Sequence, residues 1–224
     1  MALRNRTLNL GPLENNTYLL TCPATLETAV VDVGFEPEAV IETVRREGLK
    51  VTWLLGTHAH YDHAAGMLAV QRAVGGTYAL HPLERPLLAA LTLQGSMFGF
   101  PPADAPDVGH DLVDRETIRV GAEEIEVLFT PGHSPGHCAF HQPGIAQPGI
   151  VQGGVAWVGD VLFNGSVGRT DLPGGSFETL ARSIHERLFT LGDDVTCFTG
   201  HGPATTIGHE RRHNPFVGEP AGYR

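Results

Sequence analysis

Cysteine is scarce in this chain of 224 residues. The three cysteines, Cys22, Cys138 and Cys197, lie far apart and share no motif. An odd and sparse set of thiols does not build a disulfide framework. We therefore expect all three to be reduced and packed in the core, where free cysteines are usually found.

Long apolar runs are missing as well. No run approaches the roughly 20 residues that a helix needs to cross a bilayer. The N-terminal Met-Ala-Leu-Arg-Asn-Arg has no apolar core followed by a cleavage site, so it does not resemble a signal peptide. These two absences predict a cytoplasmic protein without a membrane partner.

Positive charge is in deficit. The chain has 15 Lys and Arg against 25 Asp and Glu, which gives a formal net charge of -10 at pH 7. A nucleic acid backbone needs a basic face, so we expect no nucleic-acid partner. A small anionic substrate is still compatible with this charge, because bound metal ions can reverse the local potential. The oligomeric state is left open by the sequence.

The chain also lacks an internal boundary. No linker or shift in composition divides it, and its length fits one domain. The hydrophobic fraction of 42% and the charged fraction of 18% are ordinary for a globular protein. We therefore expect a single domain over residues 1–224.

Short apolar runs alternate with helical segments in the first half of the chain. The runs predict strands at 18–21, 28–33, 51–55 and 77–80. Helices are predicted at 37–47, 63–74 and 82–91; Pro37 opens the first of them and Gly48 ends it. Strands that alternate with helices predict a layered α/β fold.

The second half is predicted to hold four more strands and one long helix. The strands are expected at 123–130, 138–141, 155–159 and 195–199. The helix is expected at 176–191, with a buried stripe of Phe177, Leu180, Ile184 and Leu188.

Three segments are expected to be irregular. Residues 94–111 show no period and predict a loop, with Met97, Phe98 and Phe100 as an apolar flap or lid. Residues 142–154 contain Gln-Pro-Gly-Ile twice and predict an elongated hairpin loop. A short C-terminal tail follows Gly202.

The segment Thr57-His-Ala-His-Tyr-Asp-His63 is the clearest sign of chemistry. It places His58, His60, Asp62 and His63 just after an apolar strand and just before a helix. A loop in that position can turn several side chains inward, and imidazole and carboxylate are ligands that suit zinc, iron or manganese. The sequence therefore predicts a metal site at this loop.

Three later segments share one pattern, a strand followed by a potential ligand beside a glycine. They end in His133, Asp160 and His201. Glycine allows the backbone to approach an ion closely, and strand ends of a layered sheet are where sites are usually assembled. Each segment is weak by itself, but together with the first cluster they predict a shared site.

In this order and spacing, the motifs resemble those of the metallo-β-lactamase superfamily. The closer resemblance is to the short bacterial form of the glyoxalase II-like hydrolases, which are hydroxyacylglutathione hydrolases. It covers nearly the whole chain, from Asn15 to Phe216. The segments that carry it are 57–63, Thr-Pro-Gly-His-Ser-Pro-Gly-His at 130–137, Gly-Asp-Val-Leu-Phe at 159–163, Gly-Arg-Thr-Asp at 168–171 and Gly-His-Gly-Pro at 200–203.

The resemblance implies a four-layer αββα sandwich and a site for two divalent metal ions, with zinc first and iron or manganese as alternatives. It also implies how the ligands divide: one ion is held by His58, His60 and His133, the other by Asp62, His63 and His201, and Asp160 bridges them.

The implied reaction is hydrolysis of small hydroxyacyl thioesters such as S-D-lactoylglutathione. Two ions about 3.5–4 Å apart can share a water and lower its pKa, so that a bridging hydroxide attacks the carbonyl carbon. One ion then stabilises the oxyanion. Asp62 would serve as a catalytic residue by orienting the hydroxide. A thiolate leaves readily, so a strong general acid is not required.

The chain departs from the long glyoxalase II form, which has a C-terminal helical domain that grips glutathione. Only Gly202 to Arg224 follow the last ligand. Arg211 and Arg212 are interpreted as a solvated charged face, with partial binding of the carrier as the alternative. His137 is interpreted as a strand-end packing residue, with a role beside the site as the alternative. Arg169 and Asp171 are expected to form a structural charge pair.

Other functions remain open at this point. The Gly-Arg-Thr-Asp segment also occurs in mononuclear iron persulfide dioxygenases of the same scaffold. A non-enzymatic metal-binding domain is disfavoured, because clusters of buried ionisable groups are costly without a use. A nuclease is disfavoured by the acidic balance.

Overall fold

The computed structural model describes residues 2–147 and 150–222. By its internal contacts, the chain divides into two compact units. The first unit is Met1–Leu112 with Ile118–Glu124, and the second is Val113–Thr117 with Ile125–Arg224. The single domain over 1–224 stays a prediction.

The first unit is built on a six-stranded mixed sheet in the order β1-β2-β3-β4-β5-β6. The first two neighbouring pairs are antiparallel, and the later three are parallel. The strands are β1 (Arg4–Leu10), β2 (Asn15–Thr21), β3 (Glu27–Val31), β4 (Lys50–Leu55), β5 (Thr77–Leu80) and β6 (Val108–Asp111).

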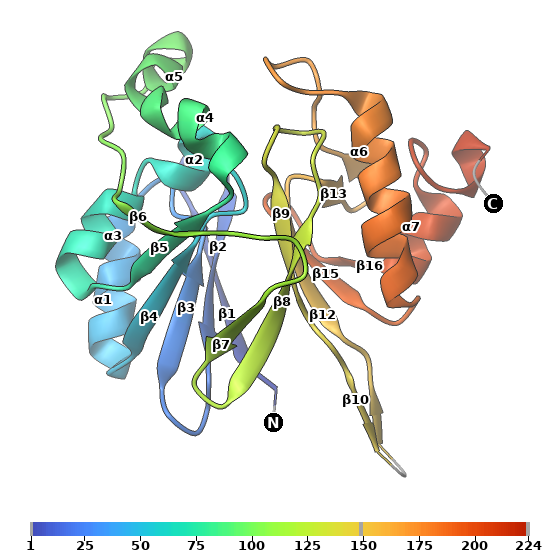
Figure 1. Ribbon diagram of the computed structural model, residues 1–224, viewed down its shortest axis with the longest axis horizontal. Coiled ribbons are helices and arrows are strands. Elements are labelled where there is room, and N and C mark those ends of the chain that lie inside the picture. Colours follow the sequence, from blue (N-terminus) through green and yellow to red (C-terminus); the bar gives the residue numbers. More distant parts are fainter. Residues whose placement is uncertain (1, 148–149, 223–224) are drawn as a thin grey trace. The chain divides into compact units, whose positions relative to one another are not determined.

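Helices α1 (Pro37–Glu47) and α3 (Met67–Val74) cover one face of this sheet (Figure 1). They contribute Val40, Val44, Met67 and Val70 to a core that also contains Leu19, Val30, Leu54 and Tyr78. Helix α1 begins at Pro37 and ends before Gly48, as predicted. The single helix expected over 63–74 is instead two helices, α2 (Tyr61–Ala64) and α3. The chain breaks between them where the N–H of Gly66 donates to the carbonyl of Val33.

The prediction of a loop at 94–111 is wrong in part. After a short η1 (Pro82–Glu84) and α4 (Arg85–Ala89), helix α5 covers Leu91–Phe98, and β6 begins at Val108. Gly95 weakens the sequence pattern of this helix, because glycine is a poor helix former. The structure requires it, since a Cβ at Gly95 would lie 2.7 Å from Cε2 of Tyr61. Within the predicted loop, residues 99–107 are the part that lacks helix or strand.

The second six-stranded sheet has the order β16-β15-β12-β9-β8-β7. Strands β12 and β15 are parallel, whereas β8/β9, β9/β12 and β15/β16 are antiparallel. The strands are β7 (Thr117–Val120), β8 (Glu123–Phe129), β9 (Cys138–Gln142), β12 (Val155–Gly159), β15 (Thr196–Thr199) and β16 (Thr205–Thr206).

Two small hairpins accompany this sheet. One pairs β13 (Leu162–Phe163) with β14 (Ser166–Val167). The other pairs β10 (Ile145–Gln147) with β11 (Ile150–Gln152), which confirms the hairpin predicted at 142–154. Residues 148–149 of that prediction lie outside the described residues.

The helix predicted at 176–191 changes type along its length. It begins as α6 (Phe177–Ser183), continues as a π-helix, η2 (Ile184–Leu188), and ends as η3 (Phe189–Leu191). Leu180, Ile184 and Leu188 are fully buried as expected, but Phe177, the first residue of α6, is 44% exposed. The tail after Gly202 also contains helices, α7 (Ile207–His213) and η4 (Glu219–Ala221).

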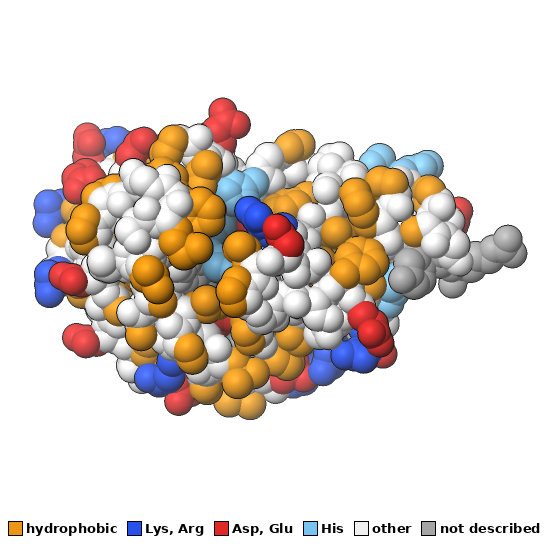
Figure 2. All heavy atoms as spheres, turned by 90° about the horizontal axis from the view of Figure 1, so that it is seen from above, with side chains coloured by type: hydrophobic (Ala, Val, Ile, Leu, Met, Phe, Trp, Pro, Cys, Tyr) orange, Lys and Arg blue, Asp and Glu red, His pale blue; other side chains and the backbone are white. Residues whose placement is uncertain are grey.

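The predicted α/β class is confirmed, because helices pack against each of the two six-stranded sheets. The three cysteines are free and buried, as expected. Among residues 2–147 and 150–222, no helix is both long and apolar enough to span a membrane. On the face drawn in Figure 2, acidic and basic side chains of the described residues are interspersed rather than separated by sign.

Candidate metal centre

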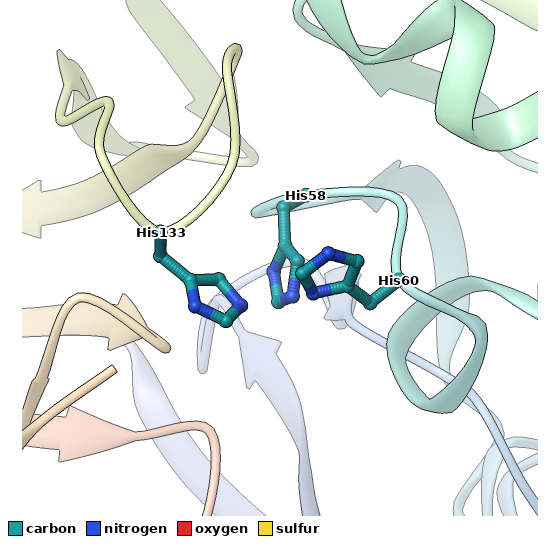
Figure 3. Close-up of side chains that lie close together, drawn as sticks. All are labelled: His58, His60 and His133. Atoms are coloured by element: carbon teal, nitrogen blue, oxygen red, sulfur yellow. The ribbon is translucent and has the colours of Figure 1, made fainter. Parts of the chain in front are cut away.

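The first unit presents three of its histidines together: His58 and His60 on the loop between β4 and α2, and His63 within α2. Strand β4 ends at Leu55, and the residues that follow are buried up to Tyr61. His58 is 0% exposed, and its ring centroid lies 4.7 Å from that of His60 and 4.2 Å from that of His63. Figure 3 shows His58 and His60 extending from this loop. The predicted cluster therefore forms within one unit.

Asp32, which sequence reasoning missed, organises these histidines. It follows the last residue of β3 and is buried. Its Oδ1 accepts from the backbone N–H of Thr57 at 2.8 Å, and its Oδ2 accepts from Thr57 Oγ1 at 2.6 Å and from His63 Nδ1 at 2.9 Å. The available signal was an acid directly after a buried strand, the pattern that identified Asp160.

These hydrogen bonds determine which ring nitrogen is left for a metal. Thr57 Oγ1 gives its only hydrogen to Asp32, so it accepts from His58 Nδ1, 2.9 Å away. His63 also donates through Nδ1. In both rings Nε2 then keeps its lone pair, and a hydrogen bond from the other nitrogen is what metal-binding histidines usually have.

Asp62 is held by a second residue that sequence reasoning missed. Asn15, buried at the start of β2, donates through Nδ2 to Asp62 Oδ2 at 3.3 Å. That same Oδ2 lies 3.7 Å from His63 Nε2. Asn15 Nδ2 also lies 3.4 Å from His63 Nε2, so this one amide orients both the Asp62 carboxylate and the His63 imidazole.

The second unit brings together His133, Asp160 and His201. His133 lies in the loop after β8 (Figure 3), Asp160 directly follows β12, and His201 comes two residues after β15. Asp160 Oδ2 is 3.8 Å from His133 Nε2 and 3.6 Å from His201 Nε2. Both distances exceed the roughly 2.7–3.2 Å of a hydrogen bond. Each distance suits a pair of ligands that share one ion, because two atoms each about 2.1 Å from a tetrahedral zinc are about 3.4 Å apart.

The Gly-Arg-Thr-Asp segment supports His133 through its backbone. His133 Nδ1 donates to the carbonyl of Arg169 at 2.8 Å, which leaves Nε2 for a metal. Gly168 makes this approach possible, because a Cβ there would lie 1.8 Å from the carbonyl oxygen of Asp160 and 3.0 Å from His133 Nδ1. The expected pair of Arg169 and Asp171 is present, with contacts of 2.7 and 2.8 Å. The hydrogen bonds from Arg169 are the main reason that the pKa of Asp171 falls to about 2.

His137 does more than pack at a strand end. It is 0% exposed, and its Nε2 lies 3.2 Å from the backbone nitrogen of Asp160. A backbone N–H can only donate, so Nε2 is the acceptor, and the ring hydrogen sits on Nδ1, 2.9 Å from Thr130 Oγ1. His137 is therefore a neutral imidazole that fastens the backbone of Asp160.

The residues present fit a metal. Three of the predicted ligand imidazoles, those of His58, His63 and His133, make a hydrogen bond through Nδ1, so Nε2 is the nitrogen that could bind a metal. The remaining donors are imidazole and carboxylate, which zinc, iron and manganese all accept. All seven predicted ligands belong to one of the two sets: His58, His60, Asp62 and His63 in the first unit, and His133, Asp160 and His201 in the second.

Comparison with known proteins assigns the chain to a class. Residues 10–201 match the model of the metallo-beta-lactamase superfamily, so the chain belongs to this family of metallo-hydrolases. It is 37% identical to the hydroxyacylglutathione hydrolase GloC of Haemophilus influenzae, an alignment that covers 84% of this chain and 86% of that protein.

Two solved structures show the same likeness. One is BLEG-1, described as a B3 metallo-beta-lactamase, with a TM-score of 0.84, 36% identity, and coverage of 96% of this chain and 99% of that one. The other is TTHA1623 in a di-iron-bound form, with a TM-score of 0.82, 36% identity, and coverage of 94% and 99%. The predicted metallo-β-lactamase fold is thereby confirmed.

Proposed function

We propose that this metallo-hydrolase cleaves small hydroxyacyl thioesters such as S-D-lactoylglutathione, with two divalent metal ions. The observation that carries the two-metal part is Asp160 Oδ2, which lies 3.8 and 3.6 Å from the Nε2 atoms of two histidines. The thioester part is supported by the likeness to GloC. The proposed metal is zinc, and iron is the first alternative because TTHA1623 binds two iron ions.

In this proposal, residues of both units complete each metal site. His58 and His60 of the first unit would bind one ion with His133 of the second. Asp62 and His63 would bind the other ion with His201, and Asp160 would contact both. Asp160 is the natural choice for the bridge, because its Oδ2 already lies beside one histidine assigned to each ion.

The chain's own residues would prepare the reaction around these ions. When bound, the two ions activate a water molecule and take up the charge that develops on the thioester carbonyl oxygen. Asn15 holds Oδ2 of Asp62, and the Asp62 carboxylate would accept a hydrogen from the attacking water and direct its lone pair. We propose Asp62 as the catalytic residue in this sense. The thiolate product needs no protonation to leave.

The carrier half of the substrate would receive little help from the basic residues near the C-terminus. Arg211 and Arg212 both pair with Asp193, at 3.3 and 3.0 Å, and Arg211 also donates to the carbonyl of Phe189. These contacts support their interpretation as a charged surface that holds α7 in place. We therefore propose weak binding of the thiol carrier, and a cytoplasmic reaction consistent with three free cysteines.

The test is turnover by the purified, metal-loaded protein. We expect S-D-lactoylglutathione to be consumed with release of one thiol per molecule, and Asp62→Asn to lose most of this activity. The Glu42→Ala protein is the control, because Glu42 is exposed on α1. Absence of thioester turnover combined with oxygen uptake on glutathione persulfide would replace the proposal by a dioxygenase. Turnover of a β-lactam alone would replace it by a lactamase.

A further inference from the structure

The backbone between His58 and His60 is held by side chains from outside the ligand loop. The first is Glu84, the last residue of η1, which is 0% exposed. Its Oε2 accepts from the backbone N–H of Ala59 at 2.8 Å. A buried carboxylate needs hydrogen-bond donors such as this N–H, because burial of a charge without partners is costly.

The second is Gln94 on α5. Its Nε2 donates to the carbonyl of Ala59 at 3.1 Å and to that of Leu87 at 2.8 Å, while its Oε1 accepts from the N–H of Tyr61 at 3.0 Å. Carbonyls only accept and an N–H only donates, so a single orientation of the amide satisfies all three bonds. Ala59 thus has both of its backbone groups bound by these two side chains.

We propose that Glu84 and Gln94 are positioning residues that fix the ligand loop in its metal-binding conformation before any metal arrives. This inference rests on the proposed metal site. Without the Glu84 and Gln94 side chains, the amides of Ala59 and Tyr61 would bond to water. The loop would then have to become ordered when the ion binds. The free-energy cost of ordering the loop would then weaken metal binding.

The test compares Glu84→Gln, Glu84→Ala and Gln94→Ala with the control Glu42→Ala. In the metal-free protein, hydrogen exchange of the Ala59 and Tyr61 amides is measured by NMR. We expect Glu84→Ala to speed exchange of Ala59 at least roughly tenfold, since its amide loses its acceptor. Glu84→Gln keeps an acceptor oxygen and should largely retain this protection. Gln94→Ala should speed exchange of Tyr61.

Zn²⁺ affinity is measured on the same variants by competition with a chelator, together with the visible spectrum of the Co²⁺-loaded protein. We expect Glu84→Ala and Gln94→Ala to bind Zn²⁺ roughly 10–100-fold more weakly, as loss of such supporting residues usually does. Glu84→Gln should fall between Glu84→Ala and the control. The cobalt spectrum should change in both alanine variants, whereas a purely structural role would lower only thermal stability.

The proposal is overturned if Glu84→Ala, or Glu84→Gln should the alanine variant not fold, matches Glu42→Ala in amide exchange and in Zn²⁺ affinity. None of these measurements uses a thioester. Suppose that the variants lose amide protection and Zn²⁺ affinity as expected but the protein has no thioesterase activity. That result would support the positioning role of Glu84 and Gln94 and refute only the proposed substrate.

Discussion

Replacing Asp32 by asparagine tests how the fold prepares its imidazoles for a metal. Asp32 accepts three hydrogens, two from Thr57 and one from His63. In Asp32→Asn one acceptor oxygen becomes an amide that donates. If that amide faced the N–H of Thr57, a buried donor would be left unsatisfied at a cost of about 1–3 kcal/mol. The amide is therefore expected to face His63.

A donor facing His63 Nδ1 reverses the tautomer of the ring. His63 Nδ1 must then accept, so the ring hydrogen moves to Nε2, the nitrogen that would bind the metal. Thr57 Oγ1 can no longer give its hydrogen to Asp32, so it is expected to donate to His58 Nδ1 and disturb that ring too. We expect Zn²⁺ affinity to fall roughly 10–100-fold, or about 1.4–2.7 kcal/mol.

The assay is competition for Zn²⁺ with a chromophoric chelator, beside ¹⁵N NMR of the imidazoles in the metal-free protein. Asp104→Asn is the matched control, because Asp104 is an exposed acid of the same unit. The variant should show His63 with its hydrogen on Nε2, whereas the wild type should show it on Nδ1. Unchanged tautomers together with control-like affinity would refute this reasoning.

Three further outcomes are expected. His137→Phe leaves the N–H of Asp160 without its acceptor, so the free energy of unfolding in denaturant should fall by about 1–3 kcal/mol; a change within error would count against this bond. Matched acyl groups on glutathione, coenzyme A and a simple thiol should react with kcat/KM values within roughly tenfold, whereas a strong glutathione preference would reveal a carrier site. Asp171 should titrate at about 2, and Arg169→Ala should return its pKa toward 3.8, as followed by NMR. Because the folded pKa is the lower one, the stabilising contribution of this pair is present above pH 3.8 and is lost as the pH falls through about 2; an unmoved pKa in Arg169→Ala would contradict the pairing.

The sequence predicted those features of the site that are local. Three histidines and one aspartate stand within the six positions 58–63, and each later candidate ligand follows its own strand, so spacing alone was enough to single them out. Asp32, Asn15, Glu84 and Gln94 act instead through contacts with residues distant in the chain. Asp32 meets Thr57 25 positions away, and Gln94 meets Ala59 35 positions away. No local pattern marks such partners, because only the fold brings them together.

The missed elements have similarly specific causes. Strand β1 reads Arg-Asn-Arg-Thr-Leu-Asn-Leu and is mostly exposed or half-buried, since it pairs only with β2 at the edge of its sheet. An edge strand needs little apolar alternation, so the pattern did not indicate it. Helix α5 was missed because Gly95 and exposed apolar residues such as Leu93 and Met97 remove the usual helical period.

Metal content is the most direct measurement of the central claim, that ligands from both units hold two ions around Asp160. Elemental analysis of the fully loaded protein should give two metal ions per chain. His201→Ala should keep one of them, whereas Asp160→Ala should weaken both sites, because Asp160 Oδ2 lies beside one histidine assigned to each ion. A fully loaded sample that never exceeds one metal ion per chain, or equal losses in the two variants, would contradict the account.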